Sequence, residues 1–161
     1  MAISEPDTSG VHLWLVLMKA YGALERVAGA SIADTGLCLT DFKILEILLH
    51  RGALPVNTLA RRVSLTSGSA TAAVDRLAAR GLVERKSREG DRRERVVHLT
   101  KAGLRLAGKS FARHAEDMEE AAAGLDLTER MELLSLLRRY GTANPKHADT
   151  GESEHDVAAN L

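Results

Sequence analysis

The chain has 161 residues, of which 45% are hydrophobic and 27% charged, and its 22 basic and 22 acidic side chains leave no formal net charge. This composition is typical of one soluble globular domain large enough for a core, and only 3% aromatic residues and three prolines favour helices. No charge-free apolar run reaches ~18 residues, and no basic region precedes an apolar stretch at the N-terminus. We therefore expect a cytoplasmic protein with neither a membrane span nor a signal peptide.

The zero net charge hides an uneven distribution along the chain. Residues 57–95 carry ten Lys or Arg against five acids, whereas residues 116–161 carry eleven acids against four bases. A basic segment indicates a surface that grips nucleic acid, with the acidic end placed away from it. A solvated charged face is the alternative, because most charge runs have no other role.

Apolar spacing predicts three helices in the first part of the chain. The helix over 11–32 carries apolar residues nearly all round, which is typical of a buried helix. Thr40 is predicted to cap a second helix that runs to His50, and 55–56 to be short and extended. Asn57 can cap a third helix that runs to Val63. The second helix is expected to direct four side chains inward: Phe42, Leu45, Leu48 and Leu49.

The segment TSGSATAAVDRLAARG, residues 66–81, reads as a helix opened by Ser and Thr and stopped by Gly81. Its small polar side chains could enter a DNA groove. The inward positions are Ala70, Val74 and Leu77, and the outward positions are Gly68, Ser69, Thr71, Ala72 and Arg76. Simple N-capping is the alternative for Ser67 and Ser69, although the free amides of the first turn would still bind phosphate.

The segment LVERKSREGDRRERVVHL, residues 82–99, has two short apolar-bearing arms around a loop that is rich in Arg and broken by Gly90. Such a loop suits a phosphate backbone. A helix of small residues followed by a basic hairpin indicates a winged helix. The alternative is that the charged side chains of the hairpin only pair with each other.

The last part of the chain predicts two further helices. Thr100 is expected to cap a long helix from Lys101 to about Gly124, and Asp126–Glu129 resembles a capping box before a helix that ends near Gly141. Apolar residues recur every three or four positions on the first of these, at Leu104, Gly108, Phe111, Ala115, Met118, Ala122 and Leu125, and on the second at Met131, Leu134, Leu137 and Tyr140. One small domain could bury these stripes only with difficulty, so a two-fold interface is expected, with an intrachain bundle as the alternative.

These elements give a mainly α fold, a winged helix-turn-helix with flanking N- and C-terminal dimerisation helices. Within it, DRRERVVHLT at 91–100 matches the Asp-x-Arg and Leu-Thr wing signature of the multiple-antibiotic-resistance regulator (MarR) family. LTSGSATAAVDRLAARGLVERK resembles the recognition helix and first wing strand of that family. The resemblance covers roughly residues 11–140. It implies a homodimeric bacterial repressor or activator that phenolic ligands, oxidants or metals release from DNA.

The resemblance also implies which residues contact double-stranded DNA. On the wing these are Arg92 and Arg93, with Asp91 orienting Arg93, and the neighbouring Arg88. On the recognition helix they are Thr66, Ser67, Ser69, Thr71 and Arg76. We expect a DNA-binding lobe over about 40–100 and dimerisation helices over about 11–32 and 101–142, within a domain at 11–142. The polar ends, 1–10 and 143–161, are expected to be flexible.

In the family, the effector pocket lies between the dimerisation helices and the DNA-binding lobe. This would bring together Trp14, Met18, Tyr21, Phe42 and Phe111, although core packing explains each of them equally well. The fragment GLCLTDFKILEILLHRG with PVNTLARRVSLTSGS looks most like the branch of the family that answers quinones and related aromatics. We favour a repressor released from an inverted-repeat operator by a small aromatic, phenolic or quinone-like effector.

The single cysteine, Cys38, offers an alternative trigger. One thiol excludes an internal disulfide, and we expect Cys38 to be a buried, inert thiol, with a redox sensor as the alternative. The six histidines show no zinc-site spacing, so we expect no metal and no cofactor. No Gly-rich phosphate loop, nucleophile elbow or paired His-Glu motif is present, which argues against an enzyme. A protein-interaction module that does not bind DNA is the remaining alternative class.

Overall fold

The computed structural model describes residues 7–88 and 91–142, and the side chains of 88 and 91–94 are outside its description. The fold is mainly helical with a small three-stranded sheet, as predicted. The helices are α1 Gly10–Ser31, α2 Leu39–Arg51, α3 Val56–Arg62, α4 Ser67–Ala79, α5 Lys101–Ala121 and α6 Leu127–Thr142, with a 3-10 turn η1 at Ala33–Thr35. The strands are β1 Leu54–Pro55, β2 Val83–Arg88 and β3 Asp91–Leu99.

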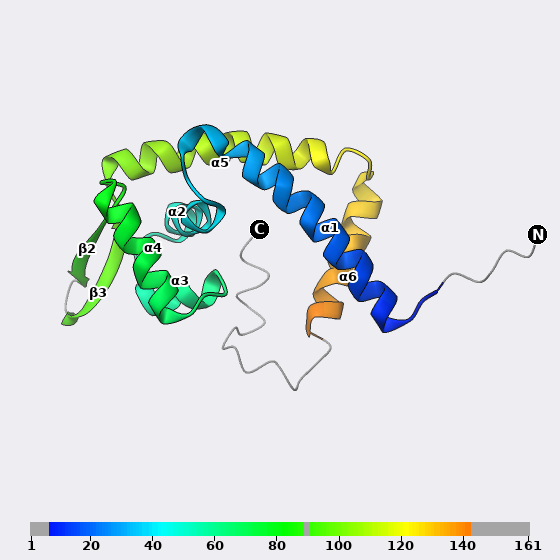
Figure 1. Cartoon of the computed structure of the whole chain (residues 1–161), viewed down its shortest axis with the longest axis horizontal. Coiled ribbons are helices and arrows are strands. Elements are labelled where there is room, and N and C mark those ends of the chain that lie inside the picture. Colours follow the sequence, from blue (N-terminus) through cyan, green and yellow to red (C-terminus); the bar gives the residue numbers. More distant parts are fainter. Residues whose placement is uncertain (1–6, 89–90, 143–161) are drawn as a thin grey trace, which may run out of the picture.

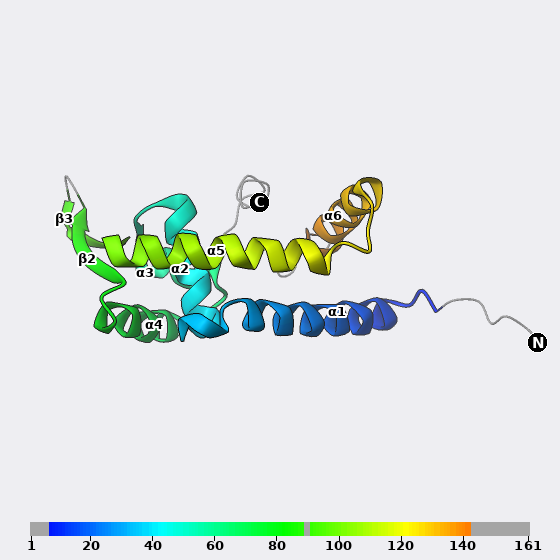
Figure 2. The same cartoon turned by 90° about the horizontal axis from the view of Figure 1, so that it is seen from above.

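Helix α5 runs along the molecule and joins its two ends. The lobe that contains α2, α3, α4 and the sheet lies at the start of α5, and α6 lies beyond its far end (Figure 1). Helix α1 packs beside α5, and the second view shows the two helices in adjacent layers (Figure 2). The wing, β2 and β3, and helix α6 are therefore at opposite ends of the chain's long axis.

The core lies in the lobe between α2, α3, α4 and the sheet. Its largest fully buried side chains include Phe42, Ile44, Leu45, Leu59 and Val97. The residues predicted to face inward from the recognition helix are all fully buried, namely Ala70, Val74 and Leu77. The 3.6-residue periodicity of α4 thus identified its buried face, and the opposite face is left to solvent.

The sheet has the order β1-β3-β2, with both pairs antiparallel. Leu54 of β1 lies opposite Val97, and Val83 of β2 opposite Leu99. Proline has no backbone N–H, and it is tolerated in β1 because β1 is an edge strand that needs no donor toward the sheet at that position. The pairing of β2 with β3 shifts register between Ser87 and Arg88, close to the tip of the wing. Gly90, the predicted break of the loop, lies outside the described residues.

A tight joint connects the sheet to α5. Thr100 caps α5, as predicted, by accepting a hydrogen bond from the Gly103 amide at 3.0 Å. The same hydroxyl donates to the Gly81 carbonyl at 2.7 Å, and the Thr100 amide donates to the Leu82 carbonyl at 3.0 Å. A Cβ on Gly103 would lie 1.9 Å from the Leu82 carbonyl oxygen. Glycine is therefore required at this position for α5 to approach the wing so closely.

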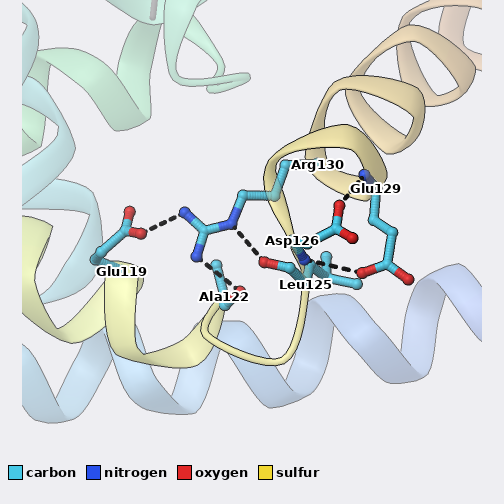
Figure 3. A network of polar contacts seen from close by, with 6 residues as sticks. All are labelled: Glu119, Ala122, Leu125, Asp126, Glu129 and Arg130. Carbon is cyan, nitrogen blue, oxygen red and sulfur yellow. Dashed lines mark hydrogen bonds and ion pairs between the residues drawn. The ribbon is translucent and has the colours of Figure 1, made fainter.

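A second joint sets the direction of α6 (Figure 3). The predicted capping box is present, because the Asp126 amide donates to Glu129 at 2.8 Å and the Glu129 amide donates to Asp126 at 2.9 Å. Arg130 then reaches back to the end of α5, donating to the carbonyls of Leu125 and Ala122 at 3.0 and 2.9 Å and pairing with Glu119. These bonds satisfy carbonyls that a helix end leaves without partners.

Two predicted helix starts were wrong by two residues, and one alternative cap was not found. Helix α2 is preceded by Cys38 as its N-cap, so Thr40 lies inside the helix. Helix α3 follows Pro55, so Asn57 lies inside it. Neither serine caps α4, because Thr66 does. Cys38 and Pro55 take the extended cap conformation without a side-chain cap hydrogen bond, so the usual capping residues that follow them misplaced the two starts.

Two helices leave most of their apolar side chains uncovered within the single chain. On α1, Trp14 is 53% exposed and Tyr21 is 49% exposed. No residue of α6 is buried, and Leu134 and Leu137 are each 41% exposed. The expectation that the first helix is buried is therefore not met within one chain. In the part of the chain described, no helix is long and apolar enough to cross a membrane.

Candidate nucleic-acid interface and adjoining groove

The first turn of α4 presents hydroxyl groups held by a local hydrogen-bond network. Thr66 Oγ1 accepts the Ser69 amide at 3.1 Å and donates to Ser69 Oγ at 2.9 Å. Ser67 donates to Oδ1 of Asn57 at 2.9 Å, and Thr71 donates to the Ser67 carbonyl at 2.9 Å. Each hydroxyl has one proton, so Ser69 alone among these four retains its own for an outside acceptor. The others face outward as hydrogen-bond acceptors.

This face of α4 is open enough for another molecule to approach closely. The predicted outward positions are all exposed, namely Gly68, Ser69, Thr71, Ala72 and Arg76, and so are Thr66 and Ser67. No atom lies within 4 Å of the place where a Cβ on Gly68 would be. Small side chains and free amides at a helix N-terminus fit a phosphate or the edge of a base.

Asn57 contributes to this surface, although the sequence indicated only a capping role for it. It lies on α3 and fixes the hydroxyl of Ser67, ten residues away. An Asn side chain offers a carbonyl acceptor and two N–H donors, so it can hold a serine rotamer across the turn between α3 and α4. No local pattern identifies this partner, because the bond depends on the angle between the two helices.

Arg76 is bonded to helix α2. Its Nη2 lies 2.7 Å from Oδ1 of Asp41, and its Nε donates to Oδ2 at 3.5 Å. The hydrogen bond to Asp41, followed by the charge of that carboxylate, raises the pKa of the Arg76 guanidinium, with a smaller contribution from Cys38. Asp41 is only 5% exposed, so this pair anchors α4 to α2. The Arg76 side chain is 53% exposed, so its expected contact with the DNA groove stays a prediction beside this structural role.

Two more arginines hold α4 in place. Arg80 donates to the carbonyls of Gly36 and Thr35 at 2.8 and 2.9 Å, which ties the end of α4 to the connection between α1 and α2. Arg85 on β2 pairs with Asp75 of α4. Some of the arginines in residues 57–95 therefore form contacts that hold the fold together.

The wing places the remaining predicted contacts on two antiparallel arms beside α4. Arg88 ends β2, and Asp91, Arg92 and Arg93 begin β3. Their side chains lie outside the described residues. The backbone alone shows that the arginine-rich stretch is at the turn of the hairpin, at the end of the molecule that carries α4 (Figure 1).

A groove of about 720 Å³ lies between α2, the end of α3 and α5. Two edge-to-face ring pairs stand at it: His50 with Phe111, whose centroids are 4.5 Å apart, and Phe42 with His114, 5.0 Å apart. Its lining carries three basic residues and one acid, with apolar contacts between them. The lining residues are Lys43, Glu46, Ile47, His50, Arg51, Arg62, Val63, Phe111, His114, Ala115 and Met118. Such a groove suits a small aromatic molecule that carries negative charge.

The groove contains only one of the five residues expected to bind a ligand. Phe111 lines it, whereas Phe42 is 1% exposed and packs in the core behind His114. The other three, Trp14, Met18 and Tyr21, lie on α1, outside the lining of the groove. A hydrogen bond to Glu25 raises the pKa of the Tyr21 phenol. The histidines and basic residues were missed because nothing in the sequence indicates that α2 and α5 face each other here.

Cys38 lies outside the groove. The expectation that this thiol is buried was wrong, because Cys38 is exposed as the N-cap of α2, where the chain enters the helix at the surface. It lies close enough to Arg76 to contribute to the pKa of that guanidinium. Among the residues described, no group of three or more His, Cys, Asp or Glu side chains could hold a metal ion.

The fold and the exposed first turn of α4 define a winged helix-turn-helix DNA-binding protein. The MarR family matches residues 37–95. The chain is 33% identical over 131 residues to the HTH-type transcriptional regulator MhqR of Bacillus subtilis, covering 81% of this chain and 90% of that protein. This protein therefore belongs to the MarR family of DNA-binding transcriptional regulators, which are not enzymes.

Solved structures share this fold. One describes the regulation of DNA binding of Bordetella bronchiseptica BpsR by 6-hydroxynicotinic acid, with a TM-score of 0.72 and 24% identity over 81% of this chain and 98% of that chain. Another is a cysteine-to-serine variant of E. coli MarR complexed with operator DNA, with a TM-score of 0.73 and 21% identity over 81% of this chain and 94% of that chain. Family membership removes the alternative of an interaction module that does not bind DNA.

Proposed function

We propose that this regulator is a homodimeric repressor that binds an inverted-repeat operator and is released by a small aromatic ligand. The observation that supports the ligand most directly is the groove between α2 and α5, where two aromatic ring pairs stand beside three basic side chains. 6-Hydroxynicotinic acid, which regulates DNA binding by the structural relative BpsR, is a hydroxylated aromatic acid. It has the aromatic ring and the negative charge that suit this groove.

The dimer is supported by the uncovered apolar faces of α1 and α6. Many large apolar side chains on these two helices are exposed in the single chain, and two copies could bury them around a two-fold axis. The dimerisation helices at about 11–32 and 101–142 would then leave the lobe at about 40–100 free to meet DNA, with one recognition helix from each copy. Successive half-sites about one helical turn apart would receive these two helices.

Replacing both Leu134 and Leu137 with Glu tests the dimer, because burying unpaired charge is very costly. We expect a monomer, or a chain that does not fold, when molar mass is measured by light scattering. The matched control replaces Arg138 and Arg139 of the same helix with Glu. A normal dimer for the leucine variant would show that α6 lies outside the interface.

The DNA contacts are assigned to the first turn of α4 and to the wing. Thr66, Ser67, Ser69 and Thr71 would meet the major groove, and Arg88, Arg92 and Arg93 the phosphates or the adjacent minor groove, with Asp91 orienting Arg93. Because α4 offers only short hydroxyl side chains there, direct base readout is modest and groove width contributes more. We expect an A·T-containing inverted repeat when fragments bound by the pure protein are sequenced.

Changing Arg92 and Arg93 to Ala tests the wing. Fewer counterions would be released on binding, so affinity and the slope of its salt dependence should both fall. The control changes Arg105 and Lys109, which are exposed on α5, and so removes the same charge elsewhere. An unchanged salt slope in a folded wing variant would contradict the assignment.

A thiol trigger at Cys38 is the second candidate, favoured by the exposure of this cysteine beside Arg76 of the recognition helix. Reversible binding remains the simpler proposal, because a lone thiol would have to end as a sulfenic acid, an adduct, a mixed disulfide or a bridge between copies. Cys38→Ser should retain release by phenolic acids. If release by every active quinone, peroxide and phenolic acid is lost while DNA affinity stays normal, Cys38 is the sensor.

A further inference from the structure

Ser31 and His114 form a buried polar contact between the end of α1 and the middle of α5. Ser31 is 2% exposed, and its Oγ lies 2.9 Å from Nδ1 of His114. The same Oγ donates a hydrogen bond to the carbonyl of Ala28 at 2.7 Å. The serine therefore connects its own helix backbone to the imidazole ring.

This arrangement fixes the proton of the imidazole ring. A serine hydroxyl has one proton, and Ser31 uses it on Ala28, so toward His114 it can only accept. Nδ1 must then be the donor and carry the proton. In the neutral ring the other nitrogen, Nε2, is left without a proton and acts as a hydrogen-bond acceptor.

The acceptor nitrogen belongs to a residue that lines the groove. His114 is half-buried, and its ring is held edge-on against Phe42. The two ring nitrogens point in different directions, so Nε2 faces away from Ser31. Within residues 7–88 and 91–142, Nε2 forms no hydrogen bond. Nε2 is not among the buried atoms that lack a partner, so water can reach it, and a hydrogen-bond donor that binds in the groove would replace that water.

We propose that His114 determines ligand specificity by accepting, at Nε2, a hydrogen bond from a hydroxyl group on the aromatic ring of the effector. The groove then selects phenols and hydroquinones over quinones and aryl ethers, whose oxygens can only accept. Lys43, on the same lining, favours a ligand that also carries a carboxylate. This inference rests on the proposed function, because it assumes that the groove is the effector site.

Nitrogen-15 NMR of the histidine side chains tests the proton position without any ligand. The full-length protein should show His114 protonated at Nδ1 and bare at Nε2. Ser31→Ala removes the acceptor for Nδ1 and should let the proton move to Nε2. Ser110→Ala is the matched control, because Ser110 is also a buried serine of this region but its hydroxyl has no partner among the described residues.

Calorimetric titration with 4-hydroxybenzoate and 4-fluorobenzoate tests the selection. Both probes are para-substituted benzoates of similar size, but only the first donates a hydrogen bond. We expect the wild-type protein and Ser110→Ala to prefer the hydroxyl compound by about tenfold. The preference should be lost in Ser31→Ala and in His114→Phe, which keeps a flat ring against Phe42.

The outcomes separate the two proposals. Equal affinity for both acids in the wild-type protein, or a proton on Nε2 of His114, would overturn the specificity role alone. If neither acid binds, and other aromatic acids also fail to bind, the groove is not an effector site and the proposed function loses its ligand together with this inference.

Discussion

Arg76 of the recognition helix holds the buried carboxylate of Asp41 on α2, with Nη2 and Oδ1 2.7 Å apart across 35 residues of sequence. The two ends of this ion pair are unequally exposed, since the Arg76 side chain is 53% exposed and that of Asp41 only 7%. Removing the arginine therefore leaves an unpaired charge in the core, whereas removing the carboxylate leaves a guanidinium that water can reach.

We predict that Arg76→Ala destabilises the protein more than Asp41→Asn does. The arginine variant should have the lower unfolding free energy of the two, measured in urea, because the buried carboxylate has lost its partner. Combining the two changes should cost less than the sum of the single losses. Strict additivity would show that the two side chains do not interact in solution.

Gly68→Ala is expected to separate DNA binding from folding. The added methyl meets no atom within 4 Å in the free protein, and Ala is favoured over Gly in a helix by up to about 1 kcal/mol. The variant should therefore be as stable as the wild type or slightly more stable, yet bind operator DNA more weakly if this turn approaches the DNA closely. Thermal melting and fluorescence anisotropy measure the two effects. Unchanged DNA affinity would place the contact elsewhere on α4.

At Gly103 the same substitution should have the opposite effect on folding. A Cβ there would lie 1.9 Å from the Leu82 carbonyl oxygen, which is backbone and cannot rotate away. Gly103→Ala must move α5 away from the base of the wing, and we expect a loss of about 1–3 kcal/mol of stability. Gly108→Ala on the same helix is the control, because its Cβ would meet nothing within 4 Å. Equal melting temperatures for the two variants would contradict the predicted clash.

Arg130→Ala should loosen the joint between α5 and α6. It removes two hydrogen bonds to carbonyls and the pair with Glu119, and leaves the capping box in place. If α6 belongs to the dimer interface, the dissociation constant of the dimer, measured by analytical ultracentrifugation, should rise by about tenfold, equivalent to ~1.4 kcal/mol. Arg138→Ala, an exposed arginine of the same helix, should leave it unchanged.

The features that the sequence predicted correctly have local causes. Thr100 and the pair Asp126 and Glu129 were identified because a cap and its partner are only three residues apart. The buried face of α4 was found because helix periodicity is also local. By contrast, the pair of Asp41 with Arg76 and the groove beside His114 depend on how distant helices pack, which no short pattern specifies.

The apolar stripe predicted on α5 is a second example of a feature that depends on how distant helices pack. Its spacing was correct for a helix, but the buried residues of α5 are Gly103, Ala107 and Ser110, on a different face. Phe111 and Met118, which belong to the predicted stripe, line the groove instead. A stripe of apolar residues shows that something covers a helix face, without showing whether a core, a ligand or a second copy does so.

The position of the wing and α6 at opposite ends of α5 makes this helix a lever. Its 21 residues span roughly 30 Å, so a tilt of about 5° moves the far end by nearly 3 Å. The groove lies along the second half of this helix, from Phe111 to Met118. In the proposed dimer, a ligand there would change the separation of two recognition helices without contacting DNA. Binding of a small molecule could thereby make the spacing of the two recognition helices incompatible with the fixed spacing of the operator half-sites.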